Sequence, residues 1–292
     1  MIRLMVSGAL DGETSDRLAA LVDARTSNQL TLRTIAFGCD PALSSEARVA
    51  VATVCASRQL DHCFDDRNRK LSDIVVLAMD MDSTLITIEC IDRLAARVGK
   101  ADEVSRITEA TMRGEIKDFA ASLVARVALL KGAPASILEA VYEDDVRLTA
   151  GAEELLAAAR QLRIKTVLVS GGFTFFAEKL KHRLALDYIH ANDLDIIDGR
   201  LTGRVAGAIV DGAAKAQFVN RIANQSSANQ ENILVIGDGA NDLPMMKLAG
   251  TSIAFHAKPI VKSLTTCAID YAGLDLVLDW MAGSHPTQPT GH

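Results

Sequence analysis

The stretch from Ile74 to Thr84 constrains the fold of this chain more than any other. Ile74 to Met79 is an unbroken apolar run, which is typical of a parallel strand that is buried on both faces. The run leads directly into Asp80-Met81-Asp82-Ser83-Thr84. Open α/β sheets bind their ligands at the carboxyl ends of the strands. We therefore expect an α/β fold with a functional site at this strand end.

The pair Asp80 and Asp82 indicates a cation or a shared proton at that site. Neighbouring like charges are costly unless a cation neutralises them or one carboxyl keeps its proton. Oxygen ligands suit Mg²⁺, which binds through one or two carboxylates together with substrate phosphate. A carboxylate can also attack phosphorus to form an aspartyl-phosphate. By itself, the pair is also compatible with a solvated turn after a strand.

Composition limits the class of protein. The chain has 292 residues, of which 49% are hydrophobic and 23% charged, so we expect a globular protein with two domains. A net charge of −6 argues against nucleic acid as a partner. No apolar run approaches the length of about 18 residues that spans a membrane, so we expect no membrane association.

The cysteines and the first residues predict a cytoplasmic protein. The five cysteines show no CxxC spacing, so we expect reduced thiols rather than disulfides or zinc ligands. Asp11 and Glu13 come too early for the apolar core of a signal peptide.

Residues 1–70 are predicted to form a separate small α/β domain. Apolar patterning favours strands over 2–6 and 30–37 and helices over 14–25 and 44–57. The charged run Asp65 to Lys70 is typical of a linker. The second domain is then 71–282, and the final residues 283–292 are expected to be a disordered tail.

A helical cap is predicted between the first and second strands of the larger domain. After Thr84 the next strand pattern begins near residue 164, and helical patterns cover 90–98, 103–112, 118–130 and 135–141. This segment is too long for an ordinary crossover between strands. We expect an inserted cap over about 88–148, which covers the strand end and supplies specificity.

Two later strand ends carry further chemistry. Ile164 to Val169 ends in Ser170-Gly171-Gly172-Phe173, which offers a hydroxyl and open backbone N–H groups to an anion. Asn232 to Ile236 ends in Gly237-Asp238-Gly239-Ala240-Asn241-Asp242, a second acidic cluster. Lys215 lies between them on a predicted helix. An ordinary Asp-Gly turn followed by a helix N-cap would explain one of these aspartates more easily than the complete six-residue sequence.

The ordered set DMDST, SGG, lysine and GDGAND resembles the haloacid dehalogenase-like phosphohydrolases. The cap sequence MRGEIKDFAASLVARVALLKG, together with SGGF and GDGANDLPM, is similar to that of the phosphoserine phosphatase family within them. The resemblance covers roughly 71–282. It implies a Rossmann-like parallel sheet with a helical cap, and an N-terminal domain of the ACT-like kind. One departure is an extra residue in the cap loop, where Lys117 and Asp118 both precede Phe119.

The resemblance also implies roles for individual residues. Asp80 is the expected nucleophile and Asp82 the general acid and base. Mg²⁺ is expected on the carboxylate of Asp80, the carbonyl of Asp82 and Asp238, with Asp242 a near neighbour.

The remaining roles concern phosphoserine, the substrate that the resemblance implies. Ser170, the Gly171 amide and Lys215 are expected to bind the phosphoryl oxygens, and Asn241 to position the phosphate. Glu89 and Arg126 are expected to bind the amino acid, and Met112 and Phe119 to close the lid.

Three alternatives stay open on the residues alone. Another small-molecule phosphomonoesterase of the same superfamily, or a phosphotransferase, would share every core motif. A receiver-type signalling module also uses Asp, Mg²⁺ and Lys, but lacks a helical insert after the first acidic motif. A homodimer is left open as the assembly.

Overall fold

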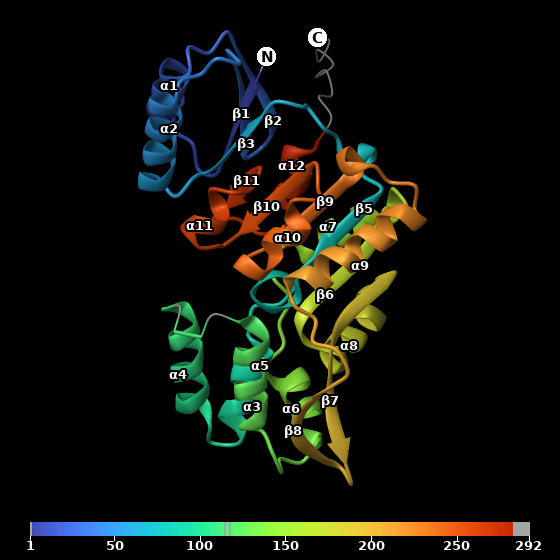
Figure 1. Ribbon diagram of the computed structural model, residues 1–292. Helices are drawn as coiled ribbons and strands as arrows, with labels where there is room; N and C mark the ends of the chain where they lie inside the picture. Colours follow the sequence, from blue (N-terminus) through green and yellow to red (C-terminus); the bar gives the residue numbers. More distant parts are fainter. Residues whose placement is uncertain (1, 114, 117, 283–292) are drawn as a thin grey trace.

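An eleven-stranded sheet runs through the computed structural model, which describes residues 2–113, 115–116 and 118–282 (Figure 1). Its strand order is β2-β3-β1-β4-β11-β10-β9-β5-β6-β7-β8. The neighbours from β11 to β7 all pair in parallel. These strands are β5 (Val76–Met79), β6 (Lys165–Phe173), β7 (Tyr188–Ile197), β9 (Ile233–Gly237), β10 (Thr251–Phe255) and β11 (Cys267–Ile269). The predicted mixed α/β fold with a mostly parallel sheet is confirmed.

The apolar run before Asp80 is explained by the burial of β5 on both faces. Leu77 and Met79 belong to a core cluster that includes residues of α7 (Ala152–Gln161) and α8 (Thr174–Leu184). Val76 and Ala78 belong to a second cluster, with residues of α9 (Gly212–Gln225) and α10 (Leu243–Met246). Successive side chains of a strand point to opposite faces, so a strand between two helical layers must be apolar throughout.

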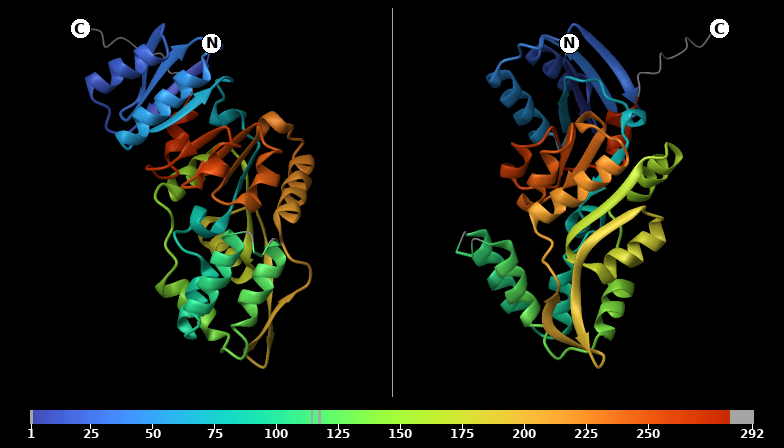
Figure 2. Two further views of the ribbon diagram at one scale, coloured as in Figure 1. Left: turned by 60° about the vertical axis from the view of Figure 1, so that its left-hand side comes forward. Right: turned by 45° about the vertical axis from the view of Figure 1, so that its right-hand side comes forward.

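The predicted helical insert follows β5. Its helices are α3 (Cys90–Arg97), α4 (Ala101–Met112), α5 (Phe119–Ala128) and α6 (Ser136–Asp144). In Figures 1 and 2 they lie beyond the carboxyl end of β5, beside the hairpin of β7 and β8 (Arg200–Ala206). Two connections link the cap to the core, and they pair with each other at Ile86 and Leu148.

Residues 2–65 form a βαββαβ unit. Its elements are β1 (Ile2–Ser7), α1 (Gly12–Leu21), β2 (Thr26–Thr31), β3 (Thr34–Cys39), α2 (Ser45–Ser57) and β4 (Asp61–Asp65). The side chains of Asp11 and Ser44 cap the two helices. Our prediction of one strand over 30–37 is wrong, because the chain reverses between Thr31 and Thr34 to make a hairpin. Apolar alternation continues through that turn and hides it in the sequence.

The βαββαβ unit and the core share the sheet. β4 pairs with β11 at His62 and Ala268. The buried carboxylate of Asp61 accepts hydrogen bonds from the backbone N–H groups of residues 270, 271 and 272. The indole Nε1 of Trp280, in α12 (Leu276–Trp280), donates to Ser7 Oγ at 3.0 Å. The unit is therefore docked on the core by buried polar contacts as well as by strand pairing.

Two of the five cysteines correct the expectation of reduced thiols. Cys63 of β4 and Cys267 of β11 form a disulfide with their Cα atoms 5.1 Å apart, whereas Cys39, Cys55 and Cys90 are free and buried. The two bonded residues are 204 positions apart. Spacing in the sequence cannot reveal such a pair, because only the adjacency of β4 and β11 brings them together.

Three expectations concern residues outside the part of the chain that the structure describes. They are the disordered tail 283–292, the extra residue at Lys117, and the side chain of Met112. Within the described residues, no helix is both long and apolar enough to cross a membrane.

Candidate active site

Three carboxylates meet where β5 and β9 end. The two strands are parallel neighbours, with Met79 opposite Ile236, so the residues that follow them, Asp80 and Asp238, lie at the same edge of the sheet. Asp242 joins them from the turn after β9, and one oxygen of each carboxylate lies within 4.8 Å of the others. The position between β5 and β9 is also where the order of the parallel strands reverses direction, the usual ligand site of such sheets.

Lys215 compensates part of this negative charge. Its Nζ lies 2.8 Å from Oδ1 of Asp80 and 2.7 Å from Oδ1 of Asp242. With three ionised carboxylates and one ammonium, the cluster carries a net charge of −2. A divalent cation would balance it, and a set of carboxylate oxygens suits a hard cation of this kind. The residues present therefore fit a metal such as Mg²⁺.

The acidic groups hold their protons more tightly than usual. Burial, followed by the charges of Asp242 and Glu89, raises the pKa of Asp238 to about 7. Burial and the charge of Asp242 also raise the pKa of Asp80, against the opposing effect of Lys215. Such shifts are expected for buried carboxyls whose negative charge is not fully compensated.

Asp82 lies next to the cluster, in a different environment. Burial, followed by the charge of Glu89, raises its pKa to about 7. Its Oδ1 is buried and has no hydrogen-bond partner among the described residues. Its Oδ2 would lie 2.6 Å from a Cβ added to Gly172, so only glycine leaves room for this carboxyl. A carboxyl with this pKa can give or take a proton near neutral pH.

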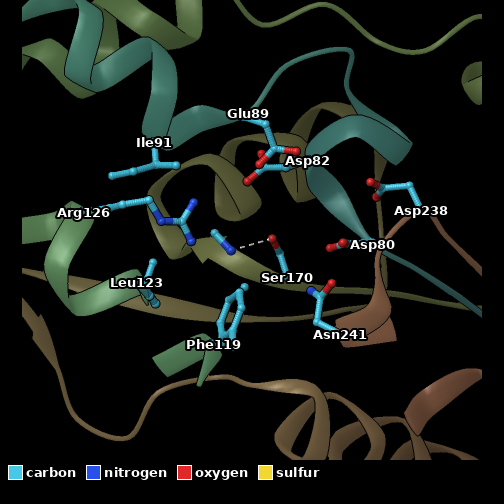
Figure 3. A pocket seen from close by; sticks show the side chains of 12 residues that line it. Asp80, Asp82, Glu89, Ile91, Phe119, Leu123, Arg126, Ser170, Asp238 and Asn241 are labelled. Carbon is cyan, nitrogen blue, oxygen red and sulfur yellow. Dashed lines mark hydrogen bonds between the residues drawn. The ribbon is translucent and has the colours of Figure 1, made fainter. Parts of the chain in front are cut away.

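Asp80, Asp82 and Asp238 line one cavity of about 140 Å³ together with residues of the cap (Figure 3). Glu89 precedes α3 and Arg126 lies in α5, so both belong to the cap. In Figure 3 Arg126 lies on the side of the cavity away from Asp238, and Glu89 lies next to Asp82, whose pKa its charge raises. The guanidinium is half-buried and donates from Nε to the carbonyl of Ser122 at 3.3 Å. The cavity thus combines acidic groups from the core with one cation and one anion from the cap.

A haloacid dehalogenase-like hydrolase family model matches residues 77–247. The phosphoserine phosphatase of Polaromonas sp. is 46% identical to this chain over 214 residues, which are 72% of this chain and 91% of that protein. The chain belongs to the phosphoserine phosphatase family of haloacid dehalogenase-like hydrolases.

Solved structures of the superfamily agree with this assignment. A hydrolase of the haloacid dehalogenase family from Salmonella enterica serovar Typhi has a TM-score of 0.87 at 31% identity, and the match covers 98% of this chain and 100% of that one. A phosphoserine phosphatase solved as an analogue of its phospho-aspartyl intermediate has a TM-score of 0.67 at 38% identity. That match covers 71% of this chain and 99% of the other.

The structure brings together the residues that the family resemblance predicts. Nine residues were assigned to catalysis, to the metal or to the substrate, and eight of them line the cavity: Asp80, Asp82, Glu89, Arg126, Ser170, Gly171, Asp238 and Asn241. Lys215 is the exception, because it lies behind Asp80 and Asp242 and is completely buried. The predicted lid residue Phe119 also lines the cavity. The roles of these residues stay predictions.

Several neighbours were not predicted from the sequence. Ile91 and Leu123 of the cap add apolar surface to the cavity. Thr84 Oγ1 donates to Asp238 Oδ1 at 3.0 Å, and Ser83 Oγ donates to Glu89 Oε1 at 2.7 Å. Both hydroxyls belong to the DMDST motif, and their place in that motif could have predicted that they lie at the site. Ser83 has a φ of 55°, which turns the chain directly after Asp82.

Proposed function

We propose that this chain is a Mg²⁺-dependent phosphatase that hydrolyses O-phosphoserine to serine and phosphate, the last step of serine biosynthesis. The observation that carries the proposal is one cavity that is lined by Asp80 and Asp82 of the core and by Arg126 and Glu89 of the cap. Phosphoserine has a phosphate at one end, and a carboxylate and an ammonium at the other. The core would bind the phosphate through a metal and hydrogen-bond donors, and the cap offers a cation to the carboxylate and an anion to the ammonium.

The cap end would recognise the amino acid. A guanidinium binds a carboxylate through two parallel hydrogen bonds, so Arg126 is assigned to the substrate carboxylate. Glu89 is assigned to the ammonium, with the hydroxyl of Ser83 fixing one of its oxygens. At about 140 Å³ the cavity is smaller than the range of roughly 300–1,000 Å³ for pockets that hold drug-sized ligands, in keeping with a small metabolite.

The sheet end would hold the metal and the phosphate. Mg²⁺ would bind the carboxylates of Asp80 and Asp238 and the carbonyl of Asp82, with Asp242 beside it. When bound, it supplies positive charge that offsets the charge of the phosphoryl group. Ser170, the Gly171 amide and Asn241 would donate hydrogen bonds to phosphoryl oxygens. Lys215 would favour the ionised form of Asp80, together with the metal, and would contribute its charge to the binding of the phosphate.

The reaction would proceed in two steps on Asp80. A carboxylate oxygen of Asp80 attacks phosphorus, the bond from phosphorus to the serine oxygen breaks, and Asp82 gives its proton to that oxygen. Asp82 then takes a proton from water as the water oxygen attacks the aspartyl-phosphate. The bond from phosphorus to Asp80 breaks, and phosphate and the free carboxylate are restored. A pKa of about 7 suits Asp82 to both proton transfers.

The remaining assignments concern the rest of the chain. We propose that 71–282 is the catalytic domain, with 88–148 as its cap, and that 1–70 is an ACT-like domain, because its βαββαβ order and its β2-β3-β1-β4 arrangement fit such a module. The net charge of −6 supports a small-molecule substrate rather than nucleic acid. Cytoplasmic location and a homodimer stay proposals.

A panel of phosphate esters tests the function. The predicted result is Mg²⁺-dependent release of phosphate from O-phosphoserine, with much slower release from O-phosphoethanolamine, which lacks the carboxylate, and from phosphoglycolate, which lacks the ammonium. Equal rates on the three esters would indicate a general phosphomonoesterase. Transfer of phosphate to an added alcohol in preference to water would indicate a phosphotransferase.

A further inference from the structure

Asn192 is a buried polar residue on β7 that none of the assigned roles uses. It is 1% exposed, and its side chain bridges two separate segments. Nδ2 donates to the carbonyl oxygens of Gly171 at 2.8 Å and Gly172 at 3.3 Å, and Oδ1 accepts from the backbone N–H of Val210 at 2.8 Å. The orientation of the amide is unambiguous, because carbonyl oxygens can only accept and a backbone N–H can only donate.

The strand pairing explains why these carbonyls need a side-chain partner. β6 and β7 pair at Val169 and His190, and pair again at Phe173 and Asn192. Three residues of β6 therefore lie opposite one residue of β7, and the bulge contains the whole Ser170-Gly171-Gly172 segment. Buried carbonyls that lose their partners in the sheet must find others. Asn192 supplies them.

The peptide group between Gly171 and Gly172 links Asn192 to Ser170, because its C=O accepts from Asn192 and its N–H donates to Ser170. In a trans peptide the C=O and N–H point in opposite directions, and the described residues contain no cis peptide. With its carbonyl held by Asn192, the peptide between Gly171 and Gly172 presents its N–H on the other side. There the Gly172 N–H donates to Ser170 Oγ at 2.8 Å, drawn as the dashed line in Figure 3.

This contact determines how the Ser170 hydroxyl can act. A serine hydroxyl has one proton and two lone pairs. Because the Gly172 N–H occupies one lone pair, the proton points away from that N–H and is available to a ligand of the cavity that Ser170 lines. The same peptide also fixes the position of Oγ.

The other end of the Asn192 side chain holds a second part of the site. Val210 directly precedes Asp211, the N-cap residue of α9, and Asp211 accepts from the backbone N–H of Lys215 at 2.9 Å. One buried amide therefore ties the Ser170 loop to the start of the helix that carries Lys215.

We propose that Asn192 is a positioning residue for phosphoryl transfer, which acts by orienting the Gly171–Gly172 peptide and, through it, the hydroxyl of Ser170. The proposal rests on the assignment of Ser170 to the phosphoryl group in the proposed function. It assigns Asn192 no contact with the substrate.

A double-mutant cycle between Asn192 and Ser170 tests the proposal. Asn192→Asp keeps the acceptor for Val210 but replaces the donor with an oxygen that repels two carbonyls. In the protein of 292 residues we expect it to lower kcat by about tenfold or more, with a smaller change in KM. In the Ser170→Ala background the same substitution should lower kcat by less than about threefold, because the group that Asn192 orients is gone. Equal losses in both backgrounds, or an unchanged kcat for Asn192→Asp alone, would overturn the proposal.

Two further variants control for folding. Asn192→Ser, which is smaller and uncharged, is taken through the same cycle in case the buried aspartate lowers the thermal midpoint. Thr174→Val is the matched control, because Thr174 Oγ1 donates to the carbonyl of Ala191 at 3.2 Å without touching the Ser170 loop. It should leave kcat unchanged. A loss in Thr174→Val as large as in Asn192→Ser would show a general effect of the strand pair and contradict the proposal.

The choice of substrate separates this proposal from the proposed function. The cycle is measured on O-phosphoserine and on acetyl phosphate, whose hydrolysis needs the phosphate loop but no recognition of an amino acid. If the wild-type protein hydrolysed acetyl phosphate but not O-phosphoserine, the substrate assignment would be refuted. The coupling between Asn192 and Ser170 would still be measured.

Discussion

The Nζ of Lys215 lies 2.8 Å from Oδ1 of Asp80, and both side chains are buried. Burial alone would lower the pKa of the lysine, but the charges of Asp242 and Asp80 outweigh it, so the pKa of Lys215 is raised and the ammonium persists. The pKa of Asp80 is nevertheless raised by burial and by Asp242. One lysine therefore does not neutralise this cluster. A bound cation should stabilise the protein most when the carboxyls are ionised.

The first prediction is that Mg²⁺ stabilises the protein more at pH 8 than at pH 5.5. Folding raises the pKa values of Asp82 and Asp238 from 3.8 to about 7. Between about pH 4 and 7 the metal-free folded state thus binds protons that the unfolded state has released. Its free energy of unfolding falls as pH rises through this window, by at most about 1.4 kcal/mol per pH unit for each group.

Thermal denaturation with and without Mg²⁺ measures the effect. Because Mg²⁺ binds the ionised carboxylates, the rise in thermal midpoint that it causes should be larger at pH 8. Asp238→Asn should lose most of the rise. An equal rise at both pH values, or a full rise in the variant, would contradict the proposed metal centre.

The second prediction concerns Arg126. Loss of a charge-assisted pair costs about 1.5–3 kcal/mol, or roughly ten- to a hundredfold in kcat/KM. Arg126→Ala should lose this much on O-phosphoserine and far less on O-phosphoethanolamine, which has no carboxylate. Arg126→Lys should recover only part of the loss, because an ammonium cannot form the two parallel hydrogen bonds. A loss of the same size on both esters would mean that Arg126 has only a structural role.

The third prediction separates the two proton transfers of Asp82. General acid and base catalysis is typically worth about 10²–10⁴-fold, so Asp82→Asn should be severely slowed on O-phosphoserine. The nitrophenolate of p-nitrophenyl phosphate leaves without a proton. If that ester enters the cavity, a burst of nitrophenolate should precede slow turnover. A wild-type rate on O-phosphoserine would show that Asp82 takes no part in the chemistry. Slow turnover of p-nitrophenyl phosphate without a burst would contradict the proposal that Asp82 takes a proton from the attacking water.

The fourth prediction concerns the N-terminal unit. Among the described residues, none that lines the cavity lies in 2–70, so a chain that begins at Leu71 should keep Mg²⁺-dependent hydrolysis. It should also unfold at a lower temperature, because it loses the contacts of Asp61 with residues 270–272 and the partner of Trp280. Folded protein without activity would show instead that the N-terminal unit completes or orders the site.

Local patterns predicted most of the catalytic core. Asp80 and Asp238 each follow an apolar run, and parallel strands bring such residues to one edge of the sheet. The sequence did not predict the features that depend on contacts between residues far apart in the chain. β4 begins with Asp61, whose burial is possible only because residues 270–272 supply three N–H groups. Asn192 is likewise an ordinary polar residue in the sequence, and acquires its role only from the bulge in β6.

The central claim is that phosphate passes through Asp80, and acid quenching of the enzyme during turnover of ³²P-labelled O-phosphoserine tests it directly. The account predicts label bound to the protein within the first turnover, with mass spectrometry of the digest locating it on Asp80. Asp80→Asn should show neither label nor phosphate release. Phosphate release without labelled protein, label on another residue, or a normal rate in Asp80→Asn would contradict the account.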